Sequence, residues 1–75
     1  MFEKVKMIIV EELGKKPDEI TTETDLRNDL GLTSIEMIEA VMVCEETFNI
    51  EMDETVLASI KTIGELVKYI EELKG

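Results

Sequence analysis

Ser34 is the residue of this sequence whose type and position best suit covalent chemistry. Thr33 precedes it, and Glu36 follows Thr33 at the spacing of a capping box, which marks the start of a helix. Because Thr33 can cap that helix, the Ser34 hydroxyl is left available at the first helical position. Free backbone N–H groups and the positive end of the helix dipole favour a phosphate there. The sequence therefore predicts a position where a phosphodiester would be stabilised.

Catalysis by Ser34 is a weaker hypothesis than modification of Ser34. A nucleophilic serine needs an activating base within hydrogen-bond reach. The sequence has no histidine, and the nearest basic residues on either side, Arg27 and Lys61, are remote along the chain. A serine before an apolar run most often serves only as a cap, but Thr33 can fill that role here. We therefore predict that the protein is not an enzyme and has no catalytic residues.

The predicted helix over residues 35–48 has two apolar faces, and only one of them is an ordinary core stripe. At about 100° per residue, the first face collects Met37, Ala40, Val41, Cys44 and Phe48. The opposite face carries Ile35, Ile38 and Met42, bordered by Glu39, Glu45 and Glu46. An exposed apolar strip with an acidic border is typical of a transient docking surface. The alternative is that neighbouring helices bury both faces.

The charge of the chain favours docking to basic proteins. Eight Lys and Arg residues face eighteen Asp and Glu residues, for a net charge of −10, and residues 28–60 contain no Lys or Arg. This charge repels nucleic acid and anionic membrane surfaces. A solvated acidic face that only maintains solubility is the alternative interpretation. We predict basic protein partners, no nucleic acid and no membrane insertion.

Other site classes find little support in the sequence. The single cysteine, Cys44, excludes an internal disulfide framework and a cysteine-based metal site; it is interpreted as a small buried hydrophobe, with a redox-active thiol as the alternative. The spacing of Asp25, Asn28, Asp29 and Gly31 is not that of a calcium loop. No apolar run approaches the roughly 18 residues of a membrane span, and residues 1–6 do not resemble a signal sequence. We therefore expect a cytoplasmic protein without a metal site.

Four helices, the third of them short, are predicted to position these residues. Periodic apolar residues indicate helices over 2–13, 35–48, 56–60 and 63–73, and the last begins with a second capping box. Residues 15–33 lack a sustained period and form a long loop with apolar residues that could anchor it. The predicted fold is an all-α, small four-helix bundle. It is expected to be a single domain over residues 1–75 and a monomer.

Residues 29–36, Asp-Leu-Gly-Leu-Thr-Ser-Ile-Glu, resemble the attachment motif of acyl carrier proteins, whose usual form is D-L-G-x-D-S-L. Comparable residues occur at the family's distances from the serine across the rest of the chain, at Val41, Met42, Glu45, Glu46, Phe48, 60–63, Tyr69 and Ile70. The resemblance implies a four-helix bundle with a long first loop. It also implies that a phosphopantetheinyl transferase adds 4'-phosphopantetheine from coenzyme A to Ser34.

The resemblance further implies a carrier that holds acyl chains as thioesters and presents them to fatty-acid or polyketide-type enzymes. Enzymes with basic docking patches would contact the second helix at Ile35, Glu36, Ile38, Glu39, Met42, Glu45 and Glu46, and Glu54 is a weaker candidate. In carriers of the fatty-acid type, the chain can enter the core between the second and third helices. That space would be lined by Ala40, Val41, Cys44, Phe48, Met52, Leu57 and Ile60, for which plain core packing is the alternative.

Three departures from the family pattern bear on the pathway. Thr33 replaces the common Asp, Ile35 replaces Leu, and Met52-Asp53 replaces Ile-Pro. One carboxylate fewer beside Ser34 changes how partners are steered. A peptidyl or aryl carrier of an assembly-line pathway is the nearest alternative function. An unmodified acidic helical interaction module is the other.

Overall fold

The fold consists of four α-helices joined by loops. The computed structural model describes residues 1–75 and contains α1 (Phe2–Leu13), α2 (Ser34–Phe48), α3 (Glu54–Ser59) and α4 (Ile63–Lys74). A short 3-10 turn, η1 (Pro17–Glu19), lies in the first loop. The predicted all-α bundle with a short third helix is confirmed. No helix is both long and apolar enough to cross a membrane.

Capping side chains start three of the helices. The hydroxyls of Thr33 and Thr62 each accept a hydrogen bond within the first turn, and both form complete capping boxes. Asp53 starts α3 by accepting a backbone N–H at 2.7 Å. α1 ends at Gly14 and α2 at Asn49, both in the left-handed conformation, with φ of 67° and 55°. Glycine and asparagine are the residues that adopt this conformation most readily.

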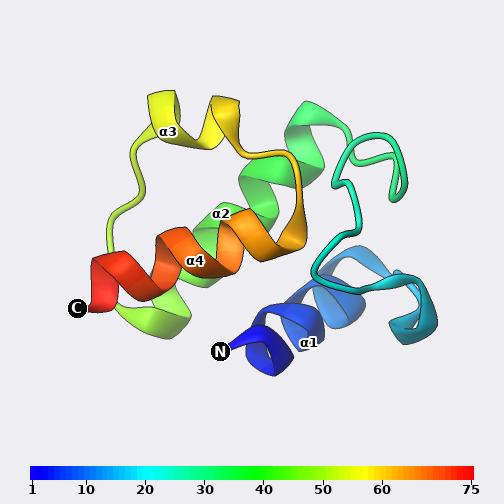
Figure 1. The fold of residues 1–75 in the computed structure, drawn as a ribbon, viewed down its shortest axis with the longest axis horizontal. Helices are drawn as coiled ribbons and strands as arrows, with labels where there is room; N and C mark the ends of the chain where they lie inside the picture. The colour runs from blue at the N-terminus through cyan, green and yellow to red at the C-terminus, as the bar shows by residue number, and fades with distance from the viewer.

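The core is built mainly where α1 packs against α2 and α4. In Figure 1, α1 lies at the bottom of the view and α3 at the top, and α2 and α4 are drawn between them. Burying one large aliphatic side chain contributes about 1.5–3 kcal/mol, so this cluster supplies most of the apolar burial that favours folding. Its members are Val5, Ile8, Ile9, Ile20, Leu26, Leu30, Leu32, Cys44, Phe48, Met52, Ile60, Ile63, Leu66, Val67 and Ile70.

The long first loop is fixed to the start of α4 by backbone hydrogen bonds. The N–H of Leu26 donates to the carbonyl of Lys61 at 2.8 Å, and the carbonyl of Thr24 accepts from the first residue of α4 at 3.0 Å. The N–H of Gly64 donates to the carbonyl of Thr22 at 2.8 Å. A Cβ at Gly64 would lie 2.8 Å from that same oxygen, so the close approach requires glycine. The sequence indicated a loop here but not η1 or this attachment.

Candidate functional site

Ser34 occupies the first position of α2, and the capping hydrogen bonds are made by its neighbours. The Thr33 hydroxyl accepts from the N–H of Glu36 at 3.2 Å, and a Glu36 carboxylate oxygen accepts from the N–H of Thr33 at 3.0 Å. Ser34 is exposed, and its hydroxyl has no hydrogen-bond partner within the chain. The prediction that Thr33 caps the helix and leaves Ser34 free is confirmed.

Replacing Thr33 and Ser34 separately should give different losses of stability. Thr33→Ala removes a cap and is expected to lower the free energy of unfolding by about 1 kcal/mol. Ser34→Ala removes a hydroxyl without a partner, so the change should stay within about 0.5 kcal/mol. Urea denaturation followed by circular dichroism measures both. An equal loss in the two variants would mean that Ser34 contributes to the cap.

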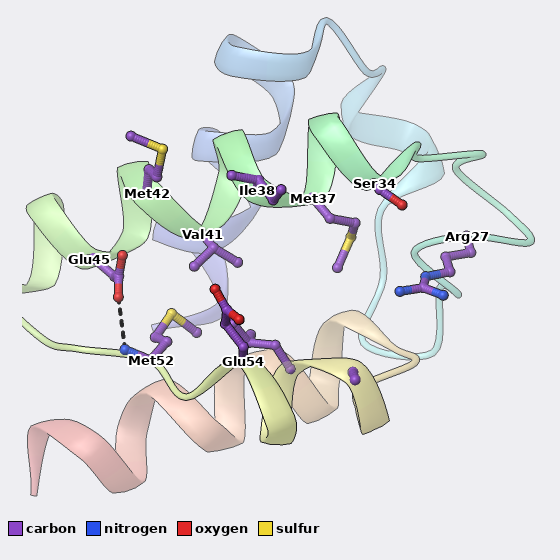
Figure 2. Close-up of a pocket in the computed structure, with 11 residues that line it drawn as sticks. Arg27, Ser34, Met37, Ile38, Val41, Met42, Glu45, Met52 and Glu54 are labelled. Carbon is purple, nitrogen blue, oxygen red and sulfur yellow. Dashed lines mark hydrogen bonds between the residues drawn. The ribbon is translucent and has the colours of Figure 1, made fainter.

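An apolar groove of about 410 Å³ begins at Ser34 and runs between α2 and α3. Met37 and Val41 point from α2 toward α3, whereas Met42 and Glu45 lie at the far end (Figure 2). The groove is open along one side, so its apolar lining is accessible from the surface. The lining residues are Arg27, Ser34, Met37, Ile38, Val41, Met42, Glu45, Met52, Glu54, Leu57 and Ala58.

The predicted lining of this space is only partly right. Val41, Met52 and Leu57 do line the groove. The other predicted residues are buried elsewhere in the core, namely Ala40, Cys44, Phe48 and Ile60. Met37 and Met42 line the groove instead, although the helical wheel assigned them to the core face and the outer face. The groove lies at the boundary between these faces, which a two-face wheel does not resolve.

The outer face of α2 is exposed, which decides between the two interpretations of its second apolar strip. Ile35, Ile38 and Met42 are 69%, 59% and 55% exposed. Neighbouring helices therefore do not bury both faces. Glu39 and Glu46 are also exposed and make no hydrogen bond or ion pair within the chain. An apolar strip with free carboxylates beside it is available for contact with another molecule.

Two of the predicted docking carboxylates already have partners within the chain. Glu36 closes the capping box, and a Glu45 oxygen accepts from the N–H of Met52 at 2.9 Å (Figure 2). Both residues are half-buried. Glu45 therefore holds the segment between α2 and α3 against α2. The N–H of Asp53 also donates to the Tyr69 hydroxyl at 2.9 Å, which ties the same segment to α4.

Cys44 is a core residue rather than a reactive thiol. Its side chain is 1% exposed and does not line the groove. Burial, with a smaller effect from the charge of Glu45, raises the pKa of the Cys44 thiol to about 11. The thiol is therefore protonated at neutral pH, and the thiolate is the reactive form. The redox-active alternative finds no support.

Arg27 is the site residue that sequence reasoning missed. We expected it to be remote from Ser34, yet both residues line the same groove. The turn after Asp25 brings it there, because an Asp25 carboxylate oxygen accepts from the N–H of Arg27 at 2.9 Å and of Asn28 at 2.8 Å. The N–H of Asn28 is the main reason why the pKa of the Asp25 carboxyl is lowered. The Asp-x-x-Asn spacing could have indicated this turn.

Comparison with known proteins decides the family. Residues 3–70 match the family model described as the phosphopantetheine attachment site. The chain belongs to this family. The crystal structure of an acyl carrier protein from Thermotoga maritima is similar, with 24% sequence identity, a TM-score of 0.82, and coverage of 95% of this chain and 82% of that chain. This likeness confirms the fold, and the family resemblance noted for residues 29–36 is confirmed as well.

Membership of the phosphopantetheine attachment-site family settles the class of chemistry. The group that the family carries is covalently attached 4'-phosphopantetheine, and the chain is a phosphopantetheine-carrying carrier protein rather than an enzyme. Family members interact with phosphopantetheinyl transferase and with processing enzymes. An attachment point for this group must be an accessible hydroxyl with space beside it for a long, partly apolar arm. Ser34 and the adjoining groove fit that requirement.

Proposed function

We propose that Ser34 carries the 4'-phosphopantetheine arm and that the protein delivers acyl chains as thioesters to fatty-acid or polyketide-type biosynthetic enzymes. The observation that carries the proposal is the position of Ser34. Its hydroxyl is exposed, has no partner within the chain, and lies at the first turn of α2 at one end of an apolar groove. Ser59, the other serine of the chain, donates its hydroxyl to the carbonyl of Val56 at 2.7 Å and lies outside this groove.

The chain's own residues supply a phosphate site and a surface for the cargo. The first N–H groups of α2 and the positive end of its dipole stabilise the negative charge of a phosphate attached to the Ser34 oxygen. When attached, the arm supplies the terminal thiol that forms the thioester. Met37, Val41 and Leu57 offer apolar contacts to an alkyl chain that enters the groove. Methionine side chains adapt to irregular shapes, which suits cargo of varying length.

The outer face of α2 is the proposed docking surface for partner enzymes. Ile35, Ile38 and Met42 supply the apolar contacts, and the free carboxylates of Glu39 and Glu46 attract a basic patch. Glu36 and Glu45 add negative charge nearby, although their carboxylates are also hydrogen-bonded within the chain. This surface is adjacent to Ser34, so a docked enzyme would be close to the arm. A cytoplasmic location remains a prediction from the sequence.

Intact mass spectrometry tests the attachment. The apo-protein is incubated with coenzyme A, Mg²⁺ and a broad-specificity phosphopantetheinyl transferase. Wild type and Ser59→Ala should each gain the mass of one arm, and Ser34→Ala should gain none. If wild type gains no mass with several transferases, the unmodified acidic interaction module becomes the better function. A gain by Ser34→Ala would place the attachment at another residue.

The cargo is tested after attachment succeeds. The modified protein is offered acyl, aminoacyl and aryl donors with the enzymes that load each of them, and the thioester is detected by its mass. Acyl loading alone supports the proposed function. Loading only with aminoacyl or aryl groups would instead support a peptidyl or aryl carrier. The apolar lining of the groove, with Met37, Val41, Met52 and Leu57, favours the acyl outcome.

A further inference from the structure

Arg27 is the only basic residue among the 11 that line the groove. Figure 2 shows Arg27 at the same end of the groove as Ser34, with the Ser34 side chain directed toward it. The two acidic lining residues are Glu54, on α3, and Glu45, at the far end. A single positive charge is therefore placed at the end where the arm is proposed to begin. Nothing in the acidic segment that follows, residues 28–60, supplies another.

The backbone of Arg27 is held in place, but its guanidinium is free. An Asp25 carboxylate oxygen accepts from the N–H of Arg27 at 2.9 Å. Leu26 and Leu30, on either side, are 1% and 5% exposed and belong to the core. The guanidinium itself makes no hydrogen bond or ion pair, and Asp29, the nearest acidic residue in sequence after it, instead accepts from the N–H of Asp25 at 2.7 Å. A fixed backbone lowers the entropy cost of binding a ligand.

We propose that Arg27 is a positioning residue that binds the phosphodiester joining the arm to Ser34. The proposal rests on the attachment of the arm to Ser34. A guanidinium binds phosphate oxygens through paired N–H donors, while the first N–H groups of α2 approach the same phosphate from the helix. The phosphodiester stays at a fixed distance from Ser34, whereas a carboxylate on the cargo would lie at the distant end of a flexible arm. The phosphodiester is therefore the anion that this arginine meets.

Binding at this point would direct the arm. A phosphodiester held only by the Ser34 oxygen can rotate and let the arm extend into solvent. Contact with Arg27, which belongs to the first loop, restricts that rotation and keeps the first part of the arm at the mouth of the groove. Arg27 would then favour the state in which the cargo lies between α2 and α3.

A cycle of variants in the unmodified and modified states tests the contact. Wild type, Arg27→Gln, Arg27→Lys and Lys68→Gln are each prepared in both states, and intact mass confirms complete modification. Lys68 is exposed on α4 and does not line the groove, so its variant matches the change in charge. Two quantities are measured for each: the change in Tm on modification at low ionic strength, and the ³¹P chemical shift of the phosphodiester.

We expect modification to raise the Tm of wild type relative to Arg27→Gln by about 2–5 °C. This is the Tm shift expected when one exposed charge pair stabilises a small domain by up to about 1 kcal/mol. The difference should shrink in high salt, and Arg27→Lys should retain part of it. The ³¹P resonance should move in Arg27→Gln and remain unchanged in Lys68→Gln. An equal Tm change in all four proteins, with a constant ³¹P shift, would overturn the proposal.

The same experiment separates this proposal from the proposed function. If wild type is modified but Arg27→Gln behaves like Lys68→Gln, the arm is attached to Ser34 and Arg27 does not bind it. One further arm loads the modified wild type and Arg27→Gln with a carboxylated acyl group and with an uncharged one. If the ³¹P shift is constant and Arg27→Gln alters Tm only with the carboxylated cargo, Arg27 binds the cargo and the phosphodiester contact is wrong. If wild type gains no mass, the function itself fails.

Discussion

We expect Leu66→Ala to lower the free energy of unfolding by about 2–5 kcal/mol, the range for replacing a buried leucine with alanine. Leu66 lies on α4, is 3% exposed and belongs to the core cluster. A chain of 75 residues has a total stability of about 4–11 kcal/mol at typical values per residue. The variant therefore loses a large share of its stability, and its Tm should fall clearly below that of wild type.

Leu73→Ala is the matched control for this prediction, because it is the same substitution one heptad later on the same helix. Leu73 is 38% exposed, so its loss should cost less than about 1 kcal/mol. Urea denaturation, fitted with the same m-value for each protein, measures the free energy of unfolding of both variants. A similar loss at the two positions would mean that α4 is not packed on its Leu66 face as described.

The second large effect concerns the docking surface. Glu39→Lys combined with Glu46→Lys should lower the kcat/KM of a phosphopantetheinyl transferase by at least about tenfold at low salt, because electrostatic steering can change association rates by about 10–10³. Both residues are exposed and lack partners within the chain, so the substitutions disturb no internal bond. The salt dependence of kcat/KM should also weaken.

Glu71→Lys combined with Glu72→Lys provides the control for that prediction. These residues are exposed on α4, and the double variant changes the net charge by the same amount. It should retain most of the activity. If both double variants lose activity equally, the transferase responds to the total charge of the protein and the outer face of α2 is not its docking surface.

The positions predicted correctly are those governed by local rules. Thr33 and Thr62 were identified as caps from residues three positions away, and the structure contains both capping boxes. Ile35 and Ile38 were assigned to an outer face by helical geometry alone, and they are exposed. Such features depend on the spacing of residues within one helix, and this spacing can be read directly from the sequence.

The features that were missed depend on residues from different elements. The Asp-x-x-Asn spacing indicates the turn that contains Arg27. That turn lies beside the groove because the first loop is bonded to the start of α4, and the spacing does not indicate this attachment. Glu45 was predicted to be open to a partner, but it binds the N–H of Met52 in the following segment. Met37 lines the groove because of where α3 lies. In each case the deciding neighbour comes from another part of the chain.

Thr33 caps α2 and Ser34 does not, so folding of the chain can precede modification of Ser34. All side-chain bonds that start α2 are made by Thr33 and Glu36, so the helix is complete before anything is attached to Ser34. Esterifying the Ser34 oxygen breaks no bond of the folded chain. A newly synthesised chain can therefore fold before the transferase acts on it. Attachment of the arm to the folded protein then requires no refolding.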